Sequence, residues 1–237
     1  MKLLNKSVFF QREPRPSTSS HQGVTNHQSW RPLDAGSTAR RRRWVRIVII
    51  VITLALLAGA SWAYWQYQVT PQLGRITETV RGRVMIQDNI LGPQIQAEVD
   101  RIVRPGARVY AESNAIAVVT FFDDSAFRVE SEGIWLVSQI NGSRNDRLSR
   151  IAIRHVQGDA LYVSRLPQPG VDSVFRVTLV GGAFALDGVA KLSVWDDEII
   201  ITLLQGQAVL ESGDGAAQAT LTEGRSATLV SGYWQPL

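Results

Sequence analysis

The sequence contains no cysteine and only three histidines, His21, His27 and His155. Without cysteine, the chain can form no disulfide, no thiolate metal site, no cysteine nucleophile and no lipid anchor on a cysteine. Three histidines are also too few for a histidine-rich metal centre. The folded part must therefore depend on its hydrophobic core alone, and 237 residues of which 45% are hydrophobic can supply one.

The formal net charge of +4 hides an uneven distribution along the chain. Residues 1–46 carry ten basic and two acidic side chains, a net charge of +8, whereas the remaining residues carry 15 basic and 19 acidic ones, a net charge of −4. The basic character is local, and no basic segment with interleaved aromatic residues accompanies it. We therefore expect no nucleic-acid partner.

One long uncharged stretch, residues 47–74, separates the basic segment from the acidic remainder. Residues 45–60 include ten Val, Ile and Leu residues, which together favour membrane insertion by roughly 3 to 6 kcal/mol. Aromatic residues flank the stretch about 20 residues apart, as a helix that crosses ~30 Å of hydrocarbon requires. They are Trp44 at one end and Trp62, Tyr64, Trp65 and Tyr67 at the other. The sequence predicts a transmembrane helix over residues 44–66.

Two other interpretations of this stretch are open. A buried core helix would need a polar face, which the stretch lacks. A cleavable signal peptide could end at Ala58-Gly59-Ala60, which resembles a small-residue cleavage site. However, the preceding 46 residues far exceed a usual n-region, and apolar and aromatic residues continue past the site. An uncleaved anchor is favoured.

The positive-inside rule orients the predicted helix. Arg40, Arg41, Arg42 and Arg43 directly precede it, and few basic residues follow it, so we expect the N-terminus in the cytoplasm and the C-terminal part outside, in a single-pass protein of the cell membrane. The same arginines would attract anionic headgroups, at about 1 kcal/mol each. With Trp44, Trp62 and Trp65, they form the predicted membrane anchor. Residues 11–39 show neither strand nor helix periodicity, which predicts a disordered cytoplasmic tail over residues 1–43. Residues 67–81 are expected to be a juxtamembrane linker.

Small residues recur on one face of the predicted helix. Ala55, Gly59 and Ala63 follow each other at intervals of four residues, and such a strip lets two helices approach closely. The pattern predicts a possible helix dimer face, although apolar spans often contain such strips by chance.

Residues 82–233 consist of short segments rich in β-branched and aromatic residues, separated by Gly, Asp, Asn and Pro. None shows a helical stripe, so we expect an all-β domain, a sandwich, a roll or a β-helix-like fold. The predicted strands are 83–87, 94–103, 108–112, 115–122, 126–130, 134–140, 148–156, 160–165, 175–180, 190–195, 199–204, 208–211, 217–222 and 226–230.

Acidic and glycine residues between these segments predict turns. They are Asp123-Asp124-Ser125, Asn141-Gly142, Gln157-Gly158-Asp159, Asp187-Gly188 and Asp196-Asp197.

None of the candidate groups carries a recognisable chemistry. Neither acidic cluster has the ligand spacing of a calcium loop, and no nucleophile elbow accompanies His155, which we interpret as a residue on a strand surface. We expect no catalytic residue, no cofactor and no metal. The paired carboxylates leave an envelope hydrolase open as a minor alternative.

The outer segment resembles the FecR-type domain of bacterial envelope proteins over residues 80–230. The resemblance is carried by the order of several pieces: VRPGARV at 103–109, VVTFFDDS at 118–125, GDALYV at 158–163, FRVT at 175–178 with Gly188 and Val194, QGQAV at 205–209 and TEGRSA at 222–227.

The resemblance implies an all-β extracytoplasmic domain on a single-pass anchor. In this family, such proteins often regulate an extracytoplasmic-function sigma factor through a folded helical cytoplasmic domain with tryptophans. Residues 1–43 show no such helix. We therefore expect a non-catalytic binding, sensing or scaffold module that recognises another envelope protein or a polymer. The alternative is a transmembrane anti-sigma-type regulator, with a sigma factor as partner, whose tail folds on binding.

Overall fold

The computed structural model describes residues 35–165, 168–196, 198–216 and 218–237. The predicted disordered tail, residues 1–43, therefore lies mostly outside the described residues, and the prediction is wrong for its last part, residues 35–43, which is helical. The chain divides into two compact units, Met1–Leu54 and Ala55–Leu237.

A single helix, α1 (Ala35–Tyr67), contains the apolar stretch. No proline interrupts it, and its apolar residues surround the axis rather than forming one stripe. The hydroxyl of Thr53 donates to the carbonyl oxygen of Ile49 at 2.9 Å, so the polar group inside the stretch is satisfied within the helix.

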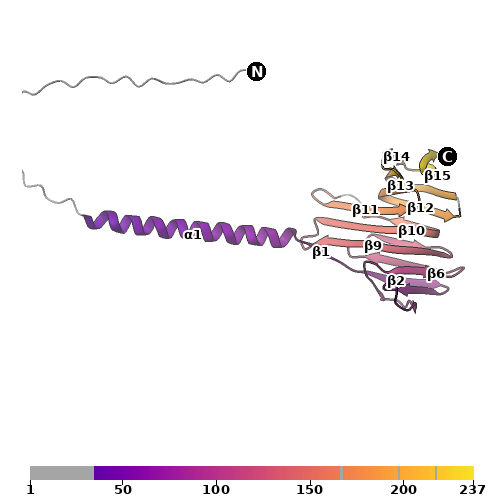
Figure 1. Cartoon of the computed structure of the whole chain (residues 1–237), viewed down its shortest axis with the longest axis horizontal. Helices are drawn as coiled ribbons and strands as arrows, with labels where there is room; N and C mark the ends of the chain where they lie inside the picture. Colours follow the sequence, from indigo (N-terminus) through magenta and orange to yellow (C-terminus); the bar gives the residue numbers. More distant parts are fainter. Residues whose placement is uncertain (1–34, 166–167, 197, 217) are drawn as a thin grey trace, which may run out of the picture. The chain divides into compact units, whose positions relative to one another are not determined.

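The rest of the described chain is β structure, which confirms the predicted fold class (Figure 1). The strands are β1 (Val69–Pro71), β2 (Gly74–Arg81), β3 (Val84–Gln87), β4 (Ile95–Gln96), β5 (Ile102–Val103), β6 (Arg108–Ala111), β7 (Ile116–Phe121), β8 (Ala126–Val129), β9 (Gly133–Ser143), β10 (Leu148–Val163), β11 (Asp172–Leu179), β12 (Gly182–Trp195), β13 (Glu198–Ser212), β14 (Gln218–Thr222), β15 (Ser226–Val230) and β16 (Tyr233–Pro236).

All of these strands belong to one hydrogen-bonded sheet, whose main path runs β16-β15-β13-β12-β11-β10-β8-β7-β2-β5. Neighbours are antiparallel except β10 and β11, which are parallel. Each half of β10 has its own partners. The first half pairs with β9 and β11, and the second half pairs with β8 and β12. The sheet therefore folds over on itself as a roll.

Glycines mark the points where the long strands change partners. Gly188 in β12 lies opposite Gly206 in β13, with φ angles of 139° and 86°. A Cβ atom on Gly188 would lie 2.1 Å from the carbonyl oxygen of Gln205, and one on Gly206 would lie 2.1 Å from that of Asp187. Only glycine fits both the backbone angles and the close approach of the two chains.

The core lies between the two parts of the folded sheet. Burial alternates along most strands, as in β7, where every second side chain is buried. Tyr162 is at the centre, with ring centroids 6.1 Å from Phe127, 6.1 Å from Phe175 and 6.2 Å from Phe184. Since each fully buried large apolar side chain stabilises the fold by roughly 1.5–3 kcal/mol, this aromatic cluster is a major part of the core.

The β structure begins earlier than the sequence predicts. Residues 67–81, expected to be a linker, contain β1 and β2, and only Gln68 separates α1 from β1. Several predicted turns also lie inside strands: Asn141-Gly142 belongs to β9, Gln157-Gly158-Asp159 to β10 and Asp187-Gly188 to β12. The turn at Asp123-Asp124-Ser125 is confirmed between β7 and β8.

Candidate functional site

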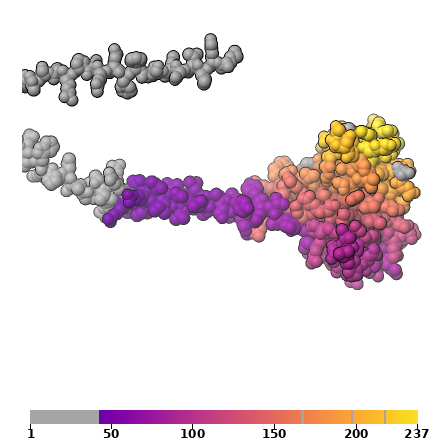
Figure 2. Space-filling model, viewed as in Figure 1, coloured from indigo at the N-terminus to yellow at the C-terminus, as the bar shows by residue number. Residues whose placement is uncertain are grey.

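The apolar part of α1 is the most distinctive surface of the described chain. Residues Arg43–Tyr67 form a stretch of 25 residues that is long and apolar enough to cross a membrane, and none of it is buried (Figure 2). Ile50 and Leu56, for example, are exposed. A soluble protein would cover such a surface, because exposed apolar area of this extent favours association with other apolar material.

The predicted anchor residues belong to this helix. Trp44, Trp62 and Trp65 are exposed on α1, as is Arg43. Arg40, Arg41 and Arg42 lie in the first part of α1, and their side chains lie outside the described residues.

The predicted helix dimer face is open. A Cβ atom on Gly59 would meet no atom within 4 Å. Ala55 is exposed and Ala63 is half-buried on the same face. Pairing of two helices through this face stays a prediction.

The helix connects to the β domain without a spacer. Val69 in β1 pairs with Ser143 at the end of β9, and Pro71 pairs with Asn141. The backbone N–H of Gln72 then donates to the carbonyl oxygen of Ile140 at 2.8 Å. One residue, Gln68, therefore separates the end of α1 from Val69, the first residue of the sheet.

Two arginines in the β9–β10 turn contact the last turn of the helix. The guanidinium of Arg144 lies 3.7 Å from the ring centroid of Trp65, a cation–π contact. The guanidinium of Arg147 donates to the hydroxyl of Tyr67 at 3.3 Å. The sequence does not point to these arginines, because it predicts the turn at Asn141-Gly142 and the pairing of β1 with β9 leaves no local signal.

The acidic cluster at Asp123 is part of the framework. The buried carboxylate of Asp123 accepts hydrogen bonds from the backbone N–H of Ser125 at 3.0 Å and from the hydroxyls of Ser125 and Ser149, both at 2.5 Å. It therefore closes the β7–β8 turn and ties it to β10. Among the described residues, no group of three or more His, Asp or Glu side chains could hold a metal ion.

The second acidic cluster forms the turn between β12 and β13. Asp196 has a φ of 45°, and Glu198 begins β13. Asp197 lies outside the described residues.

A separate polar group surrounds Asp159 on the surface. Its carboxylate accepts hydrogen bonds from the hydroxyl of Ser193 at 2.5 Å, the indole N–H of Trp195 at 3.1 Å and the hydroxyl of Ser131 at 3.3 Å. These contacts fix the side chain of Trp195, which is the last residue of β12 and is 36% exposed.

His155 is fully buried, so its interpretation as a strand-surface residue is wrong. It shares the inward face of β10 with Ile151 and Ile153, and its Nδ1 atom lies 3.0 Å from the hydroxyl oxygen of Tyr162. Its ring centroid lies 5.2 Å from that of Trp135. Burial lowers the pKa of His155 to about 4, which keeps the ring neutral at pH 7. The alternation of β10 could have shown this, because position 155 follows the same period as its apolar neighbours.

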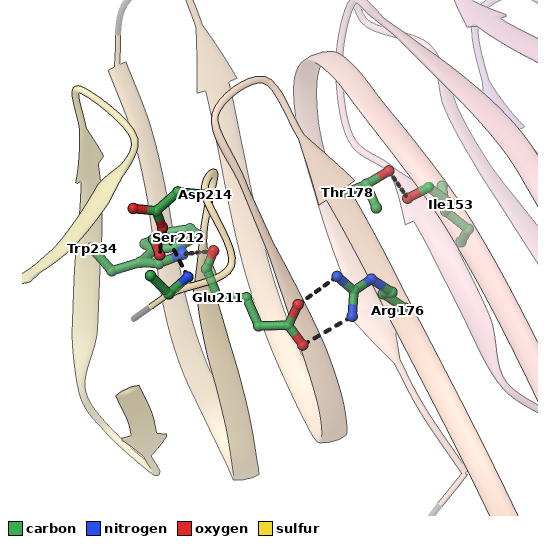
Figure 3. A network of polar contacts seen from close by, with 8 residues as sticks. Ile153, Arg176, Thr178, Glu211, Ser212, Asp214 and Trp234 are labelled. Atoms are coloured by element: carbon green, nitrogen blue, oxygen red, sulfur yellow. Dashed lines mark hydrogen bonds and ion pairs between the residues drawn. The ribbon is translucent and has the colours of Figure 1, made fainter. Parts of the chain in front are cut away.

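A polar network connects the C-terminal strands to β11 (Figure 3). Arg176 of β11 donates to both carboxylate oxygens of Glu211 in β13, and the indole N–H of Trp234 in β16 donates to the backbone carbonyl of Glu211 at 3.0 Å. In the same network, the hydroxyl of Ser212 donates to Asp214 at 2.5 Å. That bond and one from the backbone N–H of Ala216 lower the pKa of the Asp214 carboxyl.

Similarity to known proteins is found at the level of structure. No family model matches the sequence, and no curated protein matches it. Two crystal structures of a "putative anti-sigma factor" from Parabacteroides distasonis ATCC 8503, at 2.50 Å and 1.65 Å resolution, are similar to it, with TM-scores of 0.43 and 0.44 and 9% sequence identity. The similarity covers 55% of this chain and 58% of that chain, so this chain spans less than two thirds of these structures.

Proposed function

We propose that the protein is a single-pass membrane protein that presents its β domain outside the cytoplasm as a non-catalytic binding, sensing or scaffold module of the cell envelope. One observation carries this proposal. An uncovered apolar helix of spanning length is joined by a single residue to a strand of an all-β domain.

The distribution of charge supports the orientation. Arg40, Arg41, Arg42 and Arg43 precede the apolar stretch, and the chain after residue 46 has a net charge of −4. Two buried titratable groups of the β domain support a non-catalytic role, because the carboxylate of Asp123 and the Nδ1 atom of His155 have partners within the fold.

A pair of fusions tests the topology. A reporter that is active only outside the cytoplasm should be active after Leu237 and inactive after residue 39, and a cytoplasmic reporter should show the reverse pattern. The protein should also stay with the membrane after extraction at alkaline pH. The proposed orientation would be overturned if the reporter that requires the outside were active after residue 39 and inactive after Leu237.

The resemblance to the FecR-type domain favours one second candidate, a transmembrane regulator of an extracytoplasmic-function sigma factor. Under this candidate, the tail before Arg43 binds the sigma factor. Full-length protein should then co-purify a sigma factor, and a variant that lacks residues 2–39 should not. Recovery of no sigma factor with the full-length protein would leave the envelope module as the function.

A further inference from the structure

A hollow of about 600 Å³ lies where the β domain follows α1. Its lining includes Tyr67, Val69, Arg147, Leu148 and Val171. Tyr67 is the last residue of α1 and Val69 is the first residue of β1, so chain continuity alone places this hollow at the end of the apolar helix. If α1 spans the membrane as proposed above, Tyr67 belongs to the aromatic belt and the hollow opens at the level of the headgroups.

Positive charge gathers at the same place. Arg144 and Arg147 are exposed in the turn between β9 and β10, and neither guanidinium forms an ion pair with any residue that the structure describes. Their contacts are with Trp65 and Tyr67, which are uncharged. Both guanidinium groups therefore keep donors available for an anion.

Local hydrogen bonds hold this turn in shape. The hydroxyl of Ser143 donates to the side-chain oxygen of Asn145 at 2.6 Å and accepts from the backbone N–H of Leu148 at 3.0 Å. The backbone N–H of Arg147 donates to the same Asn145 oxygen at 3.3 Å. The turn is thus pre-organised, which lowers the entropic cost of binding a ligand.

The acidic residues nearby do not cancel the two arginines. Asp172 lines the hollow, but its carboxylate pairs with the guanidinium of Arg150 at 3.5 Å. Asp146 lies between Arg144 and Arg147 in the turn and is exposed. The turn therefore keeps a net positive charge beside a partly apolar hollow, a combination that fits the phosphate and the glycerol region of a lipid.

We propose that this hollow binds the headgroup of an anionic phospholipid in the outer leaflet, with the phosphodiester oxygens accepting hydrogen bonds from Arg147, which lines the hollow, and from Arg144 in the same turn. The planar guanidinium fork matches the geometry of a phosphate group. The ring of Trp65 orients the fork of Arg144, and the hydroxyl of Tyr67 orients that of Arg147. The proposal rests on the proposed membrane function and adds to it a lipid that positions the β domain against the bilayer.

The experiment uses the full chain in nanodiscs. Because the sequence has no cysteine, a fluorophore on Pro169→Cys, next to the hollow's Gly170, is a unique label. We expect discs that contain phosphatidylglycerol to lower quenching of this label by a neutral aqueous quencher about fivefold or more relative to phosphatidylcholine discs. Each arginine near an anionic surface raises the affinity about fivefold, and the lipid that then occupies the hollow shields the label. A label on Glu132→Cys, which precedes Gly133 at the start of β9, should show equal quenching in both discs.

Variants then separate this site from the rest of the protein. The double variant Arg144→Gln/Arg147→Gln should lose the difference between the two lipids, whereas Arg154→Gln, an exposed arginine on β10, should keep it. Unchanged thermal unfolding would show that the double variant is folded. Equal quenching in both lipids for the unaltered protein, or protection by inorganic phosphate in phosphatidylcholine discs, would overturn the lipid site. Loss of the protein from the discs would instead contradict the proposed membrane function.

Discussion

The side chains of Arg176 in β11 and Glu211 in β13 meet across strand β12, where the guanidinium donates to both carboxylate oxygens at 2.9 and 2.5 Å (Figure 3). The strand between them supplies Ala185 opposite Arg176 and Ala183 opposite Glu211. Small side chains at these two positions leave the space over β12 through which the two charged side chains meet. The pair thus clamps three neighbouring strands on the outer face of the sheet.

We expect this pair to contribute modestly to stability. Both side chains are partly exposed, so solvent screens their attraction, although the two-pronged geometry is favourable. A double-mutant cycle with Arg176→Gln and Glu211→Gln should give a coupling free energy of about 1 kcal/mol in denaturant unfolding at low salt. The coupling should shrink at 1 M salt, and a coupling that is indistinguishable from zero at low salt would show that the contact does not stabilise the fold.

His155 should make the stability depend on pH. Its pKa of about 4 in the folded protein lies below the ordinary 6.5, so the unfolded chain binds the proton more readily between these values. The free energy of unfolding should therefore be unaffected by this group above about pH 6.5 and should fall by about 3 kcal/mol as the pH drops through 4.

The variant His155→Phe isolates this effect. Phenylalanine keeps a ring beside Trp135 but cannot be protonated, so the difference in unfolding free energy between the unaltered protein and the variant should itself change by about 3 kcal/mol between pH 7 and pH 4. Trp135, with its ring 5.2 Å from that of His155, should report the transition by fluorescence. A difference that stays constant with pH would mean that the protonated ring finds a partner in the folded state.

The bend at Gly188 should not tolerate a side chain. We expect Gly188→Ala to destabilise the domain by more than about 3 kcal/mol, since the added carbon would collide with the carbonyl oxygen of Gln205 and would also require a φ of 139°. The matched control is Gly224→Ala, where φ is 74° and a Cβ atom would meet nothing within 4 Å. That variant should lose only about 1 kcal/mol in denaturant unfolding. Equal losses would show that backbone angle rather than close approach sets the cost.

The two neighbouring aspartates of the β7–β8 turn should behave differently. Asp123→Ala should destabilise the protein by about 2–4 kcal/mol, because it leaves the backbone N–H of Ser125 and the hydroxyl of Ser149 without their acceptor. Asp124→Asn should change the unfolding temperature little, since asparagine tolerates its φ of 67°. Added Ca²⁺ should not raise the unfolding temperature of the unaltered protein; a rise that Asp123→Ala abolishes would identify a cation site instead.

The sequence predicts much of this fold because strand burial has a local signal. Alternation of apolar residues locates β7, β8 and β15 within one residue of their observed ends. The turn predicted at Gly158 is wrong. A glycine between two apolar segments is typical of a hairpin turn, but Gly158 lies within one continuous strand, β10. Whether such a glycine ends a strand or bends it depends on the partner strands, which no local pattern specifies.

The site was less predictable than the fold. The apolar stretch of α1 is visible in composition alone, and the predicted span of 44–66 agrees closely with the stretch Arg43–Tyr67. Arg144 and Arg147 lie beside the end of α1 because Val69 pairs with Ser143, and this pairing joins segments that are remote in the sequence. β1 itself has three residues and a proline, too short to give a periodic signal.

The pairing of β1 with β9 also has a consequence for the order of synthesis. β1 is the first strand to be made, but its partner follows only after β2 to β8 have been completed. During translation, the backbone N–H and C=O groups of β1 therefore stay unpaired until β9 has been synthesised. A chain that is interrupted before Ser143 would leave this strand open beside the membrane, as a ready site for aggregation or for a chaperone.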